Sequence, residues 1–341
     1  MSDLEKINIY VPEFVGTKLD KDARMFEIFK KDGTSINRNR FLSMLISGYY
    51  NKFITECQST KDNVVAELIK QGVESKERDR IAENIVNNVF LPNVPSRKGK
   101  NPMKFSLKPT KETEGLIMNI MNNLSGNDYI SQYFCRLFMS YCEKPFYERE
   151  QIIFKDNYEL LSDACVKNKP ITFFTIWNPK YMHVVIPYRL AVGHDELFNY
   201  LLCSEMDKET GREEARSYRL NRISKINYSR VNNHISEEIL SYLNRMLRYG
   251  PQYMINDDEE SCVKLTDLGS RNFSRIYFGR PQEDRIEERP DGHYYYFKGS
   301  KDQVFLYFRR FGKDAEVISP TSLRQKISDF HRISYENYIQ T

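Results

Sequence analysis

Four cations recur at every third position in the stretch ARSYRLNRISKI, and they are Arg216, Arg219, Arg222 and Lys225. A guanidinium is planar and permanently charged, so it can hold a phosphate with two hydrogen bonds or stack on an unpaired base. Nearby tyrosines would provide further faces on which bases stack. These residue types indicate nucleic-acid binding, and of single strands in particular, with an affinity that falls steeply as salt is added.

A purely structural interpretation of the same cations stays open. Alternate residues of a strand face opposite sides, so Arg216 cannot share a face with Arg219 unless the strand bulges or ends between them. Some of the arginines would then only pair with acids such as Glu213 and Glu214. Surface pairs of that kind contribute little, commonly under ~1 kcal/mol.

Sequence motifs of enzymes are absent: there is no Walker loop, GxGxxG, HExxH or GxSxG. Arg324 and His331 have a spacing that resembles the Arg-His pair of HEPN ribonucleases and would share a helix face, but a packed or surface histidine is the favoured interpretation. The other histidines show no metal spacing, and the six cysteines form no CxxC pair, as expected of reduced thiols. We therefore expect no catalysis, no cofactor and no metal.

Composition sets the outer limits. A chain of 341 residues with 40% hydrophobic content predicts two or three domains. The net charge of +4 is small, although basic residues gather in SRKGK (96–100). No apolar run is long enough to cross a membrane, and the first residues lack the apolar core of a signal peptide, so we expect a cytoplasmic protein without a membrane partner.

The N-terminal half contains a repeat. KINIYVPE (6–13) and MKFSLKP (103–109) alternate apolar and polar residues, as strands with one buried face do. Each precedes two helices, of which the second would be capped by Ser35 in one copy and Asp128 in the other. The apolar stripe i, i+3, i+4, i+8 recurs in both: Phe41, Met44, Leu45 and Tyr49, then Phe134, Leu137, Phe138 and Cys142. Residues 60–72 and 75–90 predict two helices broken at Gly72, followed by a linker over 92–102.

Both copies resemble a ribbon-helix-helix unit. The resemblance implies that the two strands pair into a ribbon whose outward residues touch nucleic acid, with duplex DNA as one candidate ligand. These outward residues are Lys6, Asn8, Tyr10, Lys104, Ser106 and Lys108. Alternatively the tandem units form only a packing scaffold, and Asp128 would repel phosphate at the second helix.

The middle segment predicts closely spaced strands at 171–177, 183–192, 197–206 and 214–221, which is typical of a small antiparallel barrel. KNKPITFFTI, VVIPYRLAV, NYLLC and RSYRLNRISKI together resemble a WYL domain, an Sm-like barrel, over residues 158–230. Tyr200, Leu201, Pro187, Arg216 and Arg222 match its pattern, while Asn199 and Thr175 depart from it. The resemblance implies a basic groove lined by Tyr188, Arg189, Tyr200, Arg216, Arg219, Arg222 and Lys225.

The C-terminal stretch VFLYFRRFGKDAEVISPTSLRQKI resembles the extension of WYL proteins. A helix with Ser236 as N-cap and Gly250 at its end would bridge barrel and extension. HYYYF (293–297) and VFLYF (304–308) predict aromatic-rich strands with more apolar surface than a small core needs. We therefore expect homodimerisation through this region.

The chain is thus predicted to be α+β: tandem ribbon-helix-helix-like helices in 1–150, a WYL β-barrel in 151–232, and a linker helix with a dimerising α/β extension in 233–341. This order resembles the WYL accessory proteins of type VI-D CRISPR systems. The resemblance implies binding of single-stranded RNA and stimulation of an RNA-guided effector nuclease that is a separate protein. The alternative is a dimeric DNA-binding transcriptional regulator with a ligand-sensing WYL domain; a HEPN-like ribonuclease is a third.

Overall fold

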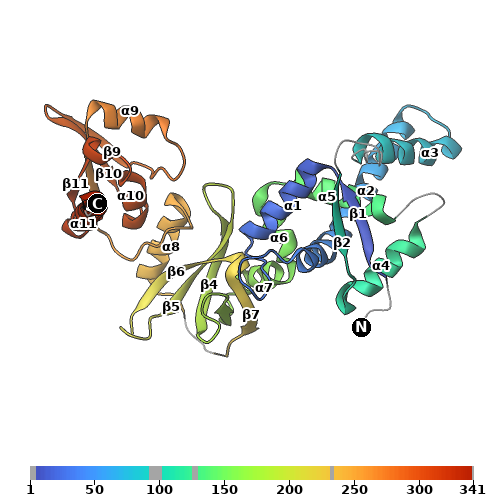
Figure 1. Ribbon diagram of the computed structural model, residues 1–341, viewed down its shortest axis with the longest axis horizontal. Coiled ribbons are helices and arrows are strands. Elements are labelled where there is room, and N and C mark those ends of the chain that lie inside the picture. The colour runs from blue at the N-terminus through green and yellow to red at the C-terminus, as the bar shows by residue number, and fades with distance from the viewer. Residues whose placement is uncertain (1–4, 92–101, 125–129, 231–233, 340–341) are drawn as a thin grey trace. The chain divides into compact units, whose positions relative to one another are not determined.

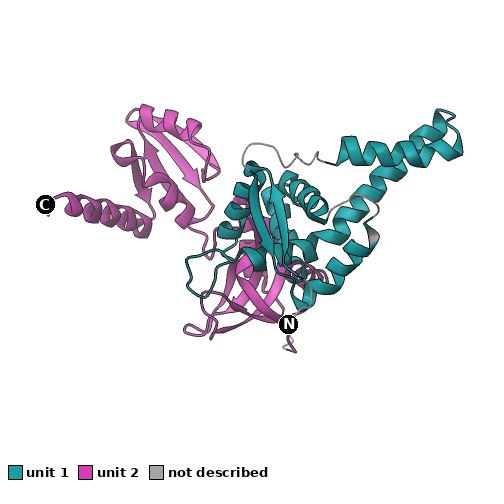
Figure 2. Cartoon of the chain, turned by 45° about the vertical axis from the view of Figure 1, so that its right-hand side comes forward, with its two compact units in different colours: residues 1–156 teal, residues 157–341 magenta. Residues whose placement is uncertain are grey.

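The computed structural model describes residues 5–91, 102–124, 130–230 and 234–339 (Figure 1). The chain divides into two compact units, residues 1–156 and 157–341, which Figure 2 colours separately. Two sequence features, the basic run 96–100 and the predicted cap Asp128, lie outside the described residues. The predicted boundary near residue 150 lies close to the division between the units, and the boundary at 232 stays a prediction.

The first unit is built on a two-stranded antiparallel ribbon of β1 (Ile7–Val11) and β2 (Met103–Leu107). The strands pair with Ile9 opposite Phe105, and both of these side chains are buried. Asn8 opposite Ser106 and Tyr10 opposite Lys104 occupy the other face. The period-two alternation therefore predicted both the strands and the face that each residue takes.

Two helices follow each strand of the ribbon: α1 (Glu13–Met25) and α2 (Arg38–Lys70), then α4 (Lys111–Asn123) and α5 (Ile130–Glu143). Helix α5 packs on β1 and α2 packs on β2, so each copy of the repeat covers the strand of the other. The predicted apolar stripes lie in this core, with only Met44 partly exposed.

Two predictions for these helices were wrong. The N-cap of α2 is Asn37, whose side chain accepts a hydrogen bond from the Arg40 amide, and not Ser35. Residues 60–70 continue α2 and do not form a separate helix, since no glycine or proline stands between Gly48 and Gly72. Beyond Gly72 come α3 (Ser75–Ile85) and the π-helical turn η1 (Val86–Phe90).

A buried ion pair ties α1 to α6 (Phe146–Ile153). Arg149 donates two hydrogen bonds to the carboxylate of Asp22, at 2.7 and 3.1 Å, and the Tyr141 hydroxyl donates a third at 3.0 Å. The Asp22 side chain has no exposed surface. Burial is the main cause that raises the pKa of Tyr141, followed by the charge of Asp22. Such a pair is costly to break, because a lone charge would be left in the interior.

The second unit begins within α7 (Lys155–Val166) and continues into an antiparallel sheet of order β6-β5-β4-β3-β7. Its strands are β3 (Ile171–Thr175), β4 (Met182–Val192), β5 (Asn199–Met206), β6 (Glu213–Arg219) and β7 (Ile223–Tyr228). Only the turn η2 (Leu220–Arg222) separates the last two strands, which lie on opposite edges. Four residues of chain span at most roughly 14 Å, which is less than the distance between the edges of a flat five-stranded sheet, so this sheet must curl. Its two edge strands share no ladder in the described part of the chain, so the predicted closed barrel is wrong.

Helix α8 (Glu237–Tyr249) covers one face of β5 and β6. Its N-cap is Ser236, as predicted, with the side chain accepting from the Ile239 amide, and Gly250 ends it at φ 138°. Leu202 and Ala215 of the sheet pack against Leu243 and Met246 of the helix.

The C-terminal region is a second antiparallel sheet of order β11-β8-β10-β9. Its strands are β8 (Ser261–Leu265), β9 (Arg285–Arg289), β10 (Gly292–Phe297) and β11 (Ala315–Ser319). The helices are α9 (Asp267–Arg275), α10 (Lys301–Phe308) and α11 (Thr321–Ile339), with the short turn η3 (Gly312–Asp314). The order β-α-β-β-α-β with this sheet is the ferredoxin-like arrangement.

Residues 304–308, predicted as a strand, lie in helix α10, so that prediction was wrong. The aromatic side chains of this region are also not a surplus. Tyr295, Phe297, Tyr307 and Phe308 form the core under the helices, so these four side chains provide no surplus apolar face, and homodimerisation through this region stays a prediction.

In the described part of the chain, no helix combines the length and the apolar character that a membrane crossing requires. All six cysteines are free thiols.

Candidate nucleic-acid interface

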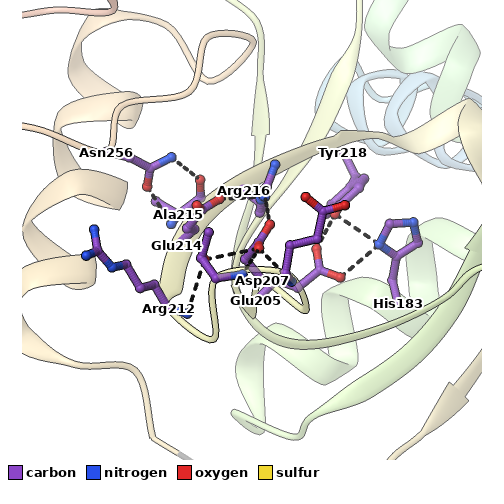
Figure 3. Close-up of polar contacts among 11 residues, drawn as sticks. His183, Glu205, Asp207, Arg212, Glu214, Ala215, Arg216, Tyr218 and Asn256 are labelled. Atoms are coloured by element: carbon purple, nitrogen blue, oxygen red, sulfur yellow. Dashed lines mark hydrogen bonds and ion pairs between the residues drawn. The ribbon is translucent and has the colours of Figure 1, made fainter.

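Arg216 lies in a network of acidic side chains (Figure 3). One terminal nitrogen of its guanidinium lies 3.0 Å from Asp207 and 2.5 Å from Glu214, and the side chain is 29% exposed. Asp207 also accepts hydrogen bonds from the Thr210 and Glu209 amides of the turn between β5 and β6. The Thr210 amide is the largest cause that lowers the pKa of Asp207. Arg216 therefore has its charge balanced within the sheet.

The same face of the sheet carries a polar cluster of three strands (Figure 3). Nδ1 of His183 lies 2.9 Å from Glu205 and 3.1 Å from the Tyr218 hydroxyl, which also donates to Glu205. Phe173 stacks on the imidazole at 5.1 Å. Burial raises the pKa of Tyr218, so this phenol stays protonated as a donor.

Arg219 lies on the opposite face from Arg216, because the two residues are three positions apart on one strand. It stands directly across from Tyr200 in the ladder, and its guanidinium carbon lies 3.0 Å from the centroid of Phe198. The structure thus brings Arg219 and Tyr200 together and separates both from Arg216.

Tyr188 occupies a bulge in β4. Pro187 pairs with Cys203 and Arg189 with Leu202, which leaves Tyr188 as the extra residue. Its hydroxyl donates to Asn244 of α8 at 2.7 Å. The Arg189 guanidinium lies 5.9 Å from the Tyr188 ring and its side chain is exposed.

The remaining two cations of the predicted groove lie on the β7 side of the sheet, next to aromatic rings. Arg222 is 5.1 Å from the centroid of Trp177, and the ammonium of Lys225 is 5.6 Å from that of Phe174. Lys169 adds a third such contact, 5.5 Å from the ring of Tyr228. We call these three pairs the β7 edge: Lys169, Phe174, Trp177, Arg222, Lys225 and Tyr228.

Two of the three rings of the β7 edge are well exposed. Trp177 is 70% exposed and Tyr228 is 46% exposed. The Tyr228 hydroxyl donates a hydrogen bond to Asp163. This hydrogen bond is the main cause of the raised pKa of Tyr228, and it also holds the ring in place. Exposed rings beside cations are what sequence-tolerant binding of unpaired bases requires.

Lys225 has a backbone conformation that is uncommon for a residue with a side chain. Its φ is +54°, and the pairing of β3 with β7 shifts register at this place. The left-handed conformation costs a non-glycine residue roughly 1–2 kcal/mol. Strain of this kind clusters at functional sites, which makes Lys225 a notable member of the β7 edge.

The predicted ribbon face is assembled as a surface of unit 1. Ser106 donates to Asn8 at 3.0 Å, Tyr10 stands opposite Lys104, and Lys6 and Lys108 lie at the same end of the ribbon. Lys6, Asn8, Tyr10, Lys104 and Lys108 are exposed, and Ser106 is partly exposed. Whether this face touches nucleic acid stays a prediction.

A solved structure described as a CRISPR Cas-related protein is 19% identical to this chain and matches it with a TM-score of 0.69 over 98% of this chain and 94% of that one. The two proteins share a fold. A second solved structure is that of proteasome accessory factor B/C of Arthrobacter aurescens, which is 12% identical over 95% of this chain and 49% of that one. Its TM-score of 0.25 is too low to indicate a shared fold. No protein-family model and no curated protein matches the sequence.

The residue pair considered for ribonuclease chemistry has structural contacts. The Arg324 guanidinium donates to the Val317 carbonyl and to Glu316, both at 2.8 Å. His331 is partly buried beside Phe330, with ring centroids 5.4 Å apart. Within the described ranges, no group of three or more His, Cys, Asp or Glu side chains could hold a metal ion.

Sequence reasoning missed Trp177, Phe174, Tyr228 and Lys169. The available signal was that Trp177, the sole tryptophan of the chain, is the last residue of a predicted strand and precedes the polar turn NPK. A large ring at the end of a strand is often outside the core. The pairing with Arg222 could not be found this way, because it depends on how β3 and η2 meet.

Proposed function

We propose that this chain is an accessory protein of a CRISPR system, and that it binds single-stranded RNA and stimulates an RNA-guided ribonuclease. The observation that carries the proposal is the fold shared with a CRISPR Cas-related protein over nearly the whole of both chains. The resemblance of the sequence to accessory proteins of type VI-D systems supports the same assignment.

We assign RNA binding to the β7 edge. Three cations stand beside three rings there, and two of those rings are well exposed. Bases can stack on Trp177 and Tyr228 while Lys169, Arg222 and Lys225 neutralise phosphates. Arg216 is a weaker candidate for this role, since Asp207 and Glu214 already neutralise it.

Binding of labelled 20-nucleotide RNA, measured by fluorescence anisotropy, tests this assignment. Arg222→Ala with Lys225→Ala should weaken binding far more than Arg216→Ala, and duplex DNA of random sequence should compete poorly. Equal losses in the two variants would contradict the β7 edge as the binding surface. Stimulation is tested separately, by adding the chain to a type VI-D effector with its guide and following cleavage of a reporter RNA; an unchanged rate would contradict the accessory role.

Homodimerisation belongs to the same proposal. Helix α11, at the C-terminal end of the second unit (Figure 2), exposes Ile333, Tyr335, Tyr338 and Ile339 by half or more. Light scattering at several concentrations, with Tyr335→Ser and Tyr338→Ser as the variant, measures whether these side chains join two copies.

A second candidate function, a DNA-binding regulator, is favoured by the ribbon. The outward residues Asn8, Tyr10 and Lys104 lie on one exposed face of an antiparallel pair, a shape that fits a major groove. Preference for one duplex sequence over others, lost on changing these three residues to Ala, would favour this function over RNA binding.

A further inference from the structure

The two faces of the C-terminal sheet differ in what covers them. Val263, Tyr295, Phe297 and Val317 pack with the helices into a common core. The alternate residues of the same strands point to the other side. We call this side the open face: Arg285, Glu287 and Arg289 of β9 with Tyr294 and Tyr296 of β10.

Two arginines lie over two tyrosines on the open face. The guanidinium carbon of Arg285 is 3.4 Å from the centroid of Tyr296, and that of Arg289 is 4.0 Å from the centroid of Tyr294. The rings are less than 10% exposed, whereas the arginine side chains are 49% and 45% exposed. The outermost planes of this face are therefore guanidinium planes with one side toward solvent.

Glu287 holds the two arginines in place. Its carboxylate pairs with Arg285 and, at 2.6 Å, with Arg289, and it accepts a hydrogen bond from the Tyr296 hydroxyl at 3.0 Å. The Arg289 hydrogen bond is the main cause that lowers the pKa of Glu287. Glu260 lies 2.9 Å from Arg285. These acids balance the cations, so the open face presents stacking planes with little net charge.

We propose that the open face binds unpaired bases of single-stranded RNA by stacking them on the planes of Arg285 and Arg289. The proposal rests on the RNA binding proposed above and adds a second contact for the same class of ligand. Bases stack on arginine planes as well as on aromatic rings, and in one class of RNA-binding module a four-stranded sheet stacks bases on its aromatic side chains. Tyr294 and Tyr296 are two residues apart on one strand, which sets the two stacks about 7 Å apart, so that neighbouring nucleotides can reach both.

The test uses a 20-nucleotide RNA with 2-aminopurine, whose fluorescence falls when the base stacks. The variant is Arg285→Lys with Arg289→Lys, which keeps both charges and removes both planes. The matched control is Arg309→Lys, because Arg309 also lies over a ring, 5.3 Å from Phe330, but outside the open face. Thermal melts confirm that each variant is folded.

We expect the double variant to bind about fivefold or more weakly than the control, since one stacked base is worth about 1–3 kcal/mol. The quenching of 2-aminopurine fluorescence should decrease along with the affinity, and the slope of log affinity against log salt should not change. Equal RNA binding by the double variant and the control would overturn this inference and leave the β7 edge assignment standing. A changed oligomeric state of the double variant with unchanged RNA binding would also overturn it, because the open face would then be a protein contact. If the wild-type chain binds no single-stranded RNA, the proposed function and this inference fall together.

Discussion

Arg222 and Trp177 form a surface pair, with the guanidinium carbon 5.1 Å from the centroid of the indole. Arg222 comes from the turn η2 and Trp177 from the residues after β3. The backbone joins them too, since the Ile176 amide donates to the Arg222 carbonyl at 3.0 Å. The curl of the sheet thus brings two positions 45 residues apart into contact at the surface.

Replacement of Trp177 by Ala should weaken single-stranded RNA binding by about 5- to 100-fold, because one stacking platform is worth about 1–3 kcal/mol. Trp177→Phe keeps a ring and should recover most of the affinity. Stability should change by no more than about 0.5 kcal/mol, since the side chain is largely exposed. Anisotropy titrations and urea unfolding measure the two effects, and an Ala variant that binds normally would remove Trp177 from the interface.

Lys225→Gly should stabilise the protein and weaken RNA binding together. Glycine adopts φ +54° without strain, so we expect a gain of about 1 kcal/mol in the free energy of unfolding. Loss of one cation should reduce the slope of log affinity against log salt by about 0.7. Lys225→Ala is the matched control, since it loses the charge and keeps the strain. Equal stabilities of the Gly and Ala variants would contradict this explanation.

Arg149→Met should destabilise the first unit by about 3–5 kcal/mol, because it leaves the Asp22 carboxylate buried without its partner. Lys70→Met, which breaks an exposed pair with Glu67, should cost under about 1 kcal/mol. Denaturant unfolding followed by circular dichroism gives both values. A small effect of Arg149→Met would mean that water reaches Asp22.

The C-terminal region should lose stability as the pH rises above 6.5. His293 lies 2.9 Å from Asp267 and also pairs with Glu288, and the Asp267 hydrogen bond is the main cause that raises the pKa of His293 above 6.5. Because the pKa of His293 is higher in the folded state, its protonation stabilises the fold fully at pH values below the unfolded-state pKa. This stabilisation is lost as the pH rises through the folded-state pKa. Melting temperatures of wild type and His293→Gln should therefore converge toward high pH; a constant difference would refute the linkage.

Local patterns predicted much of the architecture. The alternation in residues 6–11 and 103–107 predicted the ribbon and its outward face, and the strands of the five-stranded sheet followed from short apolar runs between turns. The run VFLYF failed because a short apolar segment fits a buried strand and a buried helix equally well. Its helical state depends on packing against β8 and β10, which no local pattern contains.

The candidate site was predictable only in part. The spacing of Arg216, Arg219, Arg222 and Lys225 correctly marked a cationic segment, but a turn and a bulge within it send these side chains to separate places. Arg216 meets Asp207 of the turn between β5 and β6 and Glu214 of its own strand, and Arg222 meets a ring from the residues after β3. Contacts between strands decide which side chains each cation meets, and these contacts are set by the register of the sheet.

Intrinsic fluorescence gives the most direct test of RNA binding at the β7 edge, because Trp177 is the only tryptophan and is 70% exposed. Titration of the wild-type chain with a single-stranded 20-nucleotide RNA should quench this fluorescence saturably, with an affinity that falls steeply between 50 and 200 mM salt. RNA binding that saturates by anisotropy but leaves the Trp177 emission unchanged would contradict a β7-edge interface.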